Sequence, residues 1–358
     1  MWAPLKRLSL GISLIALTST VLVLSDVHRR SPEARKIARI AILQHADSPV
    51  LDDGVAGMML ALDQAGFRNG STAVIDKYNA TGDMAIGNAI ASQITNGEYD
   101  LVLTSSTPSM QAVARANREG RTIHVFGVTA DPFSAGIGLD RSDPLRHPRH
   151  IVGQGVLLPV IDSFRMAKRM FPGLQTVGVA WNPAESNSVV FTEMARAACR
   201  ELGITLLETN VDSTSGVLDA VNSLAARGVQ ALWIGGDNVM MSATDTALHA
   251  ARRARIPAFT ITPGRPDRGT ALDVGLDFIE VGRLAGALAA DVLKGANPAT
   301  IPIRNVVDIV PRRVIVNTMA LRGLRDPWRV PDDLLKTATI VVDDRGVHTR
   351  GGSSSAKD

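Results

Sequence analysis

The sequence repeats one unit, in which a short apolar run is followed by a stretch with apolar residues at helical spacing. The run 40–43 (Ile-Ala-Ile-Leu) is continuous and short, as in a strand that is buried on both faces. Val55, Met58, Met59 and Leu62 then recur at the spacing of one helix face. Because strands that alternate with helices of about ten to fifteen residues pair in parallel sheets, the repeat predicts an α/β fold.

The repeat falls into two series, which indicates two lobes of similar plan. Strand candidates are 40–43, 73–75, 101–103 and 123–128 in the first series, and 177–180, 205–207, 231–234 and 258–261 in the second. A transition near 151–159 separates the series, and the segments 271–294 and 305–316 are expected to cross between the lobes. We therefore predict two doubly wound parallel-sheet lobes joined by a three-segment hinge. The expected boundaries are 37–153 plus 277–303 for lobe 1, 154–276 plus 304–326 for lobe 2, and 327–358 for a C-terminal extension with a disordered end.

Residues 1–36 are predicted to be a signal peptide or a membrane anchor with a basic flank. Residues 8–25 form an uncharged, mainly apolar run after Lys6 and Arg7, as at the start of exported proteins. No small-x-small cleavage site stands out after this run, and no cysteine there allows lipid attachment, so an uncleaved tether is favoured over a cleaved signal. The basic residues within 29–36 run against the positive-inside tendency and leave the topology open.

Composition and motifs exclude several other classes of protein. The single Cys199 rules out a disulfide framework and a cysteine-ligated metal cluster. A net charge of +3, with several basic residues in the N-terminal flank, disfavours binding to nucleic acid. No signature such as Gly-x-Ser-x-Gly, His-Glu-x-x-His or a phosphate-binding loop occurs, so the sequence predicts neither an enzyme nor a cofactor. An enzyme that uses His45 and Asp237 in a cleft is the weaker alternative.

Polar loops are predicted at the ends of the strands in both series. In open parallel sheets, ligands bind outside the carboxyl ends of the strands, where helix N-termini point their N–H groups. The candidate ligand-binding residues in these loops are Ser105, Ser106, Thr107, Thr129, Asp131, Asn182, Glu185, Asn187, Asp237 and Asn238. For any single one of them, a helix N-cap is favoured over a ligand contact, because Ser, Thr, Asp and Asn are preferred at that position. Convergence of loops from both series favours a binding site between the lobes.

Aromatic residues near strand ends are further candidates. Trp233 and Phe259 lie within strand runs and are expected in the core. Phe133 and Phe278 follow polar loop residues, which suits either core packing or stacking on a flat ligand. His124 lies inside an apolar strand run, so we interpret it as a core histidine rather than an acid or base.

The motifs in these loops resemble those of a known family. They are Asn79–Met84 as Asn-Ala-x-Gly-Asp, Thr107–Pro108, Asp131–Pro132, Asn182–Pro183 with Glu185, Asn187 and Ser188, Asp237–Asn238, Arg268–Gly269, and Gly275–Arg283. In the order and spacing of these motifs, residues 37–344 resemble the ABC-transporter substrate-binding proteins associated with tryptophan and tyrosine uptake. The resemblance implies the periplasmic-binding-protein type I fold and no chemistry on the ligand.

The resemblance also implies a function: the chain is expected to be the extracytoplasmic solute-binding component of an ABC importer. We expect a monomer, tethered at the outer face of the inner membrane, that captures an amino acid or similar ligand by hinge closure and docks on permease subunits. Asp237 and Asn238 are then expected to face Ser105, Ser106 and Thr107 across the cleft, with Asp237 binding an ammonium group and the hydroxyls binding a carboxylate. A ligand sensor that signals to a membrane partner is the main alternative. Departures from the family in the pocket loops leave the identity of the ligand open.

Overall fold

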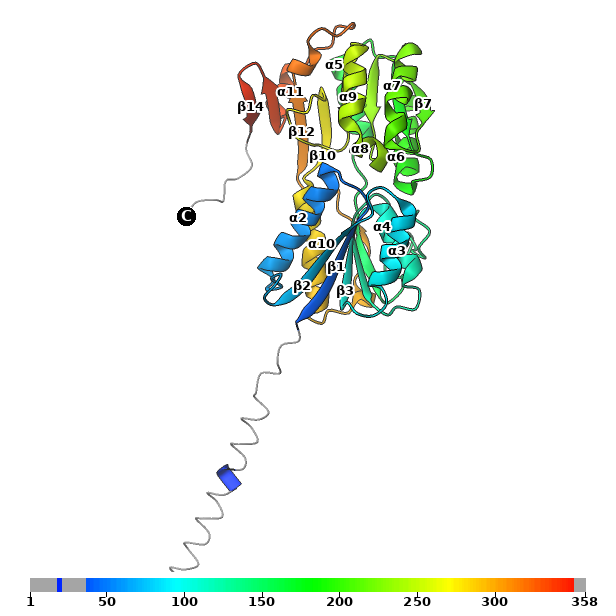
Figure 1. Cartoon of the computed structure of the whole chain (residues 1–358). Helices are drawn as coiled ribbons and strands as arrows, with labels where there is room; N and C mark the ends of the chain where they lie inside the picture. The colour runs from blue at the N-terminus through cyan, green and yellow to red at the C-terminus, as the bar shows by residue number, and fades with distance from the viewer. Residues whose placement is uncertain (1–17, 21–36, 351–358) are drawn as a thin grey trace, which may run out of the picture. The chain divides into compact units, whose positions relative to one another are not determined.

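The computed structural model of the protein describes residues 18–20 and 37–350, and residues 38–350 hold two β-sheets with helices on both faces of each (Figure 1). This arrangement confirms the predicted α/β class with two lobes built on parallel sheets. Apart from residues 18–20, the predicted N-terminal anchor lies outside the described residues, as does the end of the C-terminal extension. In the described part of the chain, no helix is both long and apolar enough to cross a membrane.

The sheet of the first lobe is entirely parallel and has the strand order β11-β5-β4-β3-β1-β2. Its strands are β1 (Ala38–Gln44), β2 (Ala73–Asn79), β3 (Leu101–Ser105), β4 (Ile123–Thr129), β5 (Ile151–Gly155) and β11 (Arg304–Asn305). Its helices are α2 (Pro49–Gln64), α3 (Met84–Ile94), α4 (Thr107–Ala116) and α10 (Phe278–Leu293). The predicted strands of the first series match β1 to β4, whereas β5 lies in the segment that was expected to be a transition.

Both faces of this sheet are covered, which explains the unbroken apolar run in β1. Ile40 and Ile42 pack in the core beneath α2 and α10, which lie side by side on one face (Figure 1). Ala41 and Leu43 pack in a separate core beneath α3 and α4. Alternate side chains of one strand therefore serve opposite layers, so a strand with two apolar faces is required here.

Helices α2 and α10 touch through their backbones. A Cβ atom built on Gly57 of α2 would lie 2.0 Å from the carbonyl oxygen of Ile279, and one on Gly282 of α10 would lie 2.0 Å from that of Gly54. Real Cβ atoms do not approach other atoms so closely, so glycine is required at both positions. This contact fixes where α10 begins, directly after the chain leaves the second lobe.

The sheet of the second lobe has the strand order β14-β13-β12-β10-β9-β8-β6-β7. Its strands are β6 (Thr176–Trp181), β7 (Thr205–Asn210), β8 (Ala231–Ile234), β9 (Ala258–Thr260), β10 (Leu272–Leu276), β12 (Arg312–Asn317), β13 (Ile340–Asp343) and β14 (Gly346–Thr349). Its helices are α5 (Val160–Met170), α6 (Ser186–Leu202), α7 (Val217–Ala226), α8 (Asn238–Ser242), α9 (Thr244–Arg253) and α11 (Asp332–Thr337). The pairs β10–β12 and β13–β14 are antiparallel, and the other pairs of this sheet are parallel.

The predicted lobe boundaries differ from the structure at the C-terminal side. Arg304–Asn305, assigned to the second lobe, form β11 and pair with β5 in the first sheet. This strand is too short and polar to show an apolar run. Residues 332–349, expected to be part of an extension, form α11, β13 and β14, and the apolar run Ile340–Val342 adds β13 to the second sheet beside β12. The second lobe is therefore larger than predicted.

The chain passes between the two sheets in three segments. They are residues 156–159 between β5 and α5, Asp277 between β10 and α10, and residues 306–311 between β11 and β12. These crossings lie close to the predicted lobe boundaries at 153/154, 276/277 and 303/304. That they act as a hinge stays a prediction.

Candidate ligand-binding site

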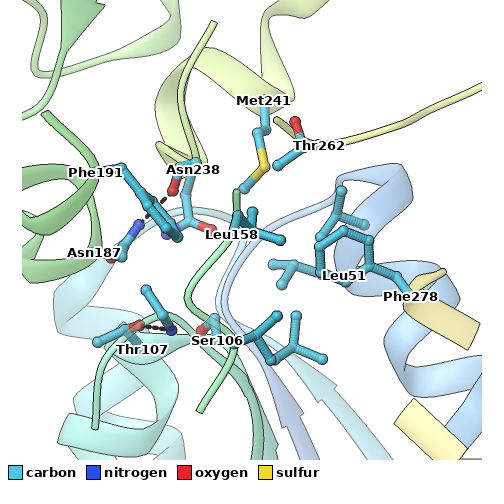
Figure 2. Close-up of a pocket in the computed structure, with 15 residues that line it drawn as sticks. Leu51, Ser106, Thr107, Leu158, Asn187, Phe191, Asn238, Met241, Thr262 and Phe278 are labelled. Carbon is cyan, nitrogen blue, oxygen red and sulfur yellow. Dashed lines mark hydrogen bonds between the residues drawn. The ribbon is translucent and has the colours of Figure 1, made fainter. Parts of the chain in front are cut away.

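A cavity lies at the carboxyl ends of the strands, and residues of both sheets line it (Figure 2). Its volume is about 40 Å³. The lining residues are Val50, Leu51, Ser106, Thr107, Val128, Ala130, Val156, Leu158, Asn187, Phe191, Gly236, Asn238, Met241, Thr262 and Phe278. The cavity therefore has the location that parallel sheets predict for a ligand, although its present volume admits only a few water molecules.

The predicted site residues divide into two groups. Ser106, Thr107, Asn187 and Asn238 line the cavity, with the first pair in the first lobe and the second pair in the second lobe. The others are absent from the lining that the structure describes: Ser105, Thr129, Asp131, Asn182, Glu185 and Asp237. Most of this second group support the loops that carry the lining residues.

In the first lobe, α4 begins at the cavity with a strained residue. Ser106 caps the helix, and its hydroxyl accepts a hydrogen bond from Ser109 N at 3.1 Å. The φ of Ser106 is 121°, in the region that favours glycine. Val128, which also lines the cavity, has a φ of 51° in the same region. Backbone strain at non-glycine residues is retained when the surrounding structure enforces it, and it is concentrated at functional sites.

The hydroxyl groups of the first lobe are oriented as donors. Thr107 Oγ1 accepts a hydrogen bond from Ala130 N at 3.2 Å (Figure 2), as Ser106 Oγ does from Ser109 N. Within the described residues neither hydroxyl donates to a protein acceptor. Since each hydroxyl also carries one proton, both retain a donor for a ligand.

Other polar residues of the first lobe hold its loops instead. Asp131 pairs with Arg141, whose guanidinium group lies 5.1 Å from the ring centroid of Phe133. Phe133 therefore packs within this loop, away from the cavity. His124 is fully buried and shares a hydrogen bond of 3.0 Å with Thr104, and burial lowers its pKa to about 3. It is a neutral core histidine, as predicted.

In the second lobe, Asp237 joins three segments of the chain. Its carboxylate accepts hydrogen bonds from Asn182 N at 2.6 Å, Ser188 Oγ at 2.6 Å and Met240 N at 2.8 Å. The last bond makes Asp237 the N-cap of α8. Burial, reinforced by the nearby Glu185 carboxylate, raises the pKa of Asp237, while these hydrogen bonds oppose the shift. The side chain is 2% exposed and fills a structural role beneath the cavity wall.

Glu185 is the second buried carboxylate of this lobe, and amides surround it. Its oxygens accept hydrogen bonds from the side chains of Asn182, Asn187 and Asn238 and from the backbone of Asn238. Asn187 Nδ2 also donates to Gly236 O at 2.8 Å (Figure 2). Both bonds of Asn187 thus use its nitrogen, and its Oδ1 has no hydrogen-bond partner among residues 37–350. This buried acceptor belongs to a residue that lines the cavity.

Apolar side chains make up most of the remaining lining, and sequence reasoning missed several of them. Phe191 lies one helical turn after Asn187 on α6, a spacing that places both on one face and was the available signal. Phe278 also lines the cavity, whereas Trp233 and Phe259 pack against Phe164 in the core. The site therefore combines a polar group from each lobe with an apolar body.

Comparison with known proteins decides the family. The model of the family described as ABC transporter substrate binding protein matches residues 39–342. The chain belongs to this family. It is accordingly a non-enzymatic solute-binding protein, and ABC-transporter substrate-binding proteins are extracytoplasmic.

This substrate-binding protein is similar to several characterised relatives. It is 26% identical over 307 residues to a tyrosine-binding protein of Clostridioides difficile, covering 86% of each chain. A Streptococcus pneumoniae ABC domain in complex with L-Trp has a TM-score of 0.78 at 24% identity, over 86% of this chain and 100% of that one. A ligand-free, open substrate-binding protein with adhesive properties from Clostridium difficile has a TM-score of 0.58 at 26% identity, over 81% of this chain and 96% of that one.

Proposed function

We propose that the protein is the solute-binding component of an ABC importer and captures an amino acid, or a ligand with the same head group, between its lobes. The observation that carries the proposal is the division of hydrogen-bonding groups across the cavity. The first lobe offers the hydroxyl donors of Ser106 and Thr107, and the second carries the buried, unpaired acceptor Asn187 Oδ1 on a residue of the lining. A carboxylate needs donors and an ammonium group needs acceptors, so the two ends of an amino acid match the two lobes.

Electrostatics support this orientation of the ligand. Ser106 and Thr107 stand at the N-terminus of α4, where the helix dipole favours a negative charge. Asn187 is hydrogen-bonded to the buried Glu185, whose carboxylate favours a positive charge nearby. Asp237 already accepts three hydrogen bonds, so the proposal assigns the ammonium contact to Asn187 and gives Asp237 a supporting role.

The apolar body of the cavity favours an aromatic or large aliphatic side chain. Leu51, Leu158, Phe191, Met241 and Phe278 project toward one another around the gap (Figure 2). The relatives that bind tyrosine and L-Trp support the same class of ligand for this chain. Stacking and apolar burial would then provide affinity, while the polar groups select the amino-acid head.

Hinge motion is part of the proposal, because a bound amino acid needs more room than the cavity now offers. Ligand pockets usually enclose about 300 Å³ or more, against about 40 Å³ here. A hydrogen bond of 3.0 Å joins Ser242 Oγ of the second lobe to Asp47 O of the first. The lower TM-score with the open, ligand-free relative supports a closed arrangement. Rotation about the three crossing segments would admit the ligand.

The transport role adds partners and a location. We propose that the closed form docks as a monomer on permease subunits, and that residues 1–36 tether it to the outer face of the inner membrane. The support for the tether is the apolar run at 8–25 after Lys6 and Arg7.

A thermal-shift screen of the twenty amino acids tests the ligand class. At a concentration of about one hundred times the dissociation constant, a ligand adds roughly 2.7 kcal/mol to the unfolding free energy. We expect aromatic or large aliphatic amino acids to raise the melting temperature, and native mass spectrometry of protein from its own host to show the retained ligand. If all twenty leave the melting temperature unchanged while another metabolite raises it, the ligand class is wrong.

A matched pair of variants tests the ammonium contact. Asn187→Ala should weaken binding of the best amino acid by about 1.5–3 kcal/mol, because a hydrogen bond to a charged group is lost. Asn182→Ala is the control, since Asn182 also contacts Glu185 but stands outside the cavity lining. Calorimetric titration of both variants gives the comparison, and equal losses of affinity would show that Asn187 acts only through Glu185.

A further inference from the structure

A second, smaller cavity adjoins the first one within the described residues. Its volume is about 20 Å³, which is just above the roughly 10–15 Å³ that one water molecule needs. Val50, Met241 and Thr262 line both cavities and form the wall between them. Met241 and Thr262 are both drawn in this wall (Figure 2), and methionine side chains adapt readily to a guest. The small cavity is therefore an extension of the candidate site.

A buried carboxyl group lines this extension. Asp273 lies on β10, next to Thr260 of β9, and is 2% exposed. The Thr270 side chain and the Gly264 backbone lower the pKa of this carboxyl group and so oppose the effect of burial. Its Oδ1 atom nevertheless has no hydrogen-bond partner in residues 37–350. A buried unsatisfied oxygen destabilises a protein, so its retention requires an explanation.

The threonines beside Asp273 are oriented as acceptors toward the cavity. Thr260 Oγ1 donates its proton to Ile234 O at 2.8 Å. Its contact of 2.9 Å with Thr262 Oγ1 must then use the proton of Thr262. With that proton engaged, Thr262 Oγ1 presents only lone pairs to a guest. Asp273 and Thr262 both have oxygen atoms that lack a donor, so a hydrogen-bond donor placed between them would pair with both.

Size and charge restrict this donor to a small neutral group. The space holds about one non-hydrogen atom with its protons. Burial raises the pKa of Asp273 to about 7, and the nearby guanidinium groups of Arg313 and Arg268 oppose this shift. Those two cations would repel an ammonium group of the ligand. A hydroxyl or a ring N–H meets all of these conditions.

We propose that Asp273 and Thr262 form a specificity subsite that binds an O–H or N–H donor at the far end of the ligand's side chain. The proposal rests on the proposed function, because it requires a ligand whose apolar body fills the main cavity. The subsite selects a ligand with a hydroxylated or heteroaromatic side chain over an otherwise identical ligand with an apolar side chain. A site built to hydrogen-bond such a group rejects an analogue that lacks it, since its own polar atoms would stay unpaired.

Two pairs of amino acids that differ only in this donor test the subsite. L-tyrosine is compared with L-phenylalanine, and L-tryptophan with 3-benzothienyl-L-alanine, which has sulfur in place of the indole N–H. Calorimetric titration of the full-length protein in detergent should show at least a tenfold preference for the donor in one pair. In Asp273→Leu the preference should fall below threefold, while affinity for the analogue without a donor is kept or improved.

Two further variants separate recognition from folding. Thr262→Val keeps the shape of the side chain and removes its oxygen, so it should also reduce the preference, even if Asp273→Leu fails to fold. Thr95→Val is the control, because Thr95 is buried and its hydroxyl donates to the backbone carbonyl of Ala91, but it lines neither cavity. It should leave the preference unchanged.

The outcomes separate the subsite from the proposed function. If the amino acids bind but the wild type shows no preference, or Asp273→Leu and Thr262→Val retain it, the subsite is wrong and the function stands. If none of the four ligands binds, the aromatic ligand class fails, and p-cresol against toluene tests the subsite alone. Only p-cresol should then shift the ¹³C-labelled methyl signal of Met241, and equal shifts with both compounds would overturn the subsite.

Discussion

Replacing Asp237 with alanine should destabilise the second lobe strongly and leave the direct contacts of the ligand in place. Asp237 is buried, and its carboxylate accepts hydrogen bonds from Asn182 N, Ser188 Oγ and Met240 N. These donors belong to the loop after β6, to α6 and to α8. Removal of the carboxylate therefore leaves three buried donors without their acceptor.

The magnitude follows from these contacts. Loss of an N-cap alone costs about 1 kcal/mol. Hydrogen bonds to charged groups are worth about 1.5–3 kcal/mol each, and part of that is offset because the buried carboxylate no longer needs to be desolvated. Burial raises the pKa of Asp237, which shows that this desolvation is substantial. We expect Asp237→Ala to lower the unfolding free energy by about 3–5 kcal/mol, well above the value for a simple cap.

Urea unfolding and calorimetric titration measure the two quantities separately. Ser188→Ala is the matched control, because it removes one of the three donors and should cost about 1.5–3 kcal/mol. Affinity per folded molecule should fall modestly in Asp237→Ala, through displacement of Asn238. A variant that keeps its stability but loses 2–4 kcal/mol of binding would refute this reasoning and restore Asp237 as a ligand contact.

Three other perturbations have defined outcomes. Burial raises the pKa of Asp273 from 3.8 to about 7, so between these pH values the folded state holds a proton that the unfolded state has released, and the free energy of unfolding falls as pH rises. Asp273→Asn does not titrate, so from pH 4 to pH 8 its free energy of unfolding should rise relative to that of the wild type by up to about 4 kcal/mol. Circular-dichroism melts of both proteins across this range measure the difference, and parallel stability curves would contradict the prediction. Gly282→Ala forces its Cβ into Gly54 O and should cost about 1–3 kcal/mol or more by the same melts, whereas Gly87→Ala, whose Cβ would meet Ala80 at 3.4 Å, should be neutral or stabilising. In cell fractionation the full chain should stay with membranes, and a chain without residues 1–36 should be soluble; an N-terminus near Asp26 on soluble envelope protein would disprove the tether.

Much of the fold was predictable because its signal is local. The run 40–43 serves two cores, so every residue of it is apolar and the strand is visible without its partners. β11 has two polar residues and exists only through its pairing with β5, which no local pattern reveals. In the second antiparallel pair, β13–β14, the first strand contains the apolar run at 340–342, which was available as a signal but was assigned to an extension.

The site was less predictable, because loop position does not determine side-chain direction. Asp237 and Asn238 are neighbours in one predicted loop, yet Asp237 faces the interior and Asn238 faces the cavity. Capping and binding favour the same residue types, so only the three-dimensional contacts separate them. Asp273 was the reverse case, since a lone carboxyl between Leu272 and Val274 in a buried strand is itself a signal of function.

The hydrogen-bonding polarity of the two lobes provides a physical basis for coupling binding to closure. The first lobe presents hydroxyl protons whose oxygens already accept backbone bonds, and the second presents the oxygens of Asn187 and Thr262, whose donors are already engaged. Because the first lobe presents only donors and the second only acceptors among these groups, neither lobe alone can bind both ends of a zwitterion. Under the proposed function, a ligand that carries both charges would gain its second set of bonds only when the lobes meet. The free energy of that second set, rather than of the first, would then shift the equilibrium toward the closed form.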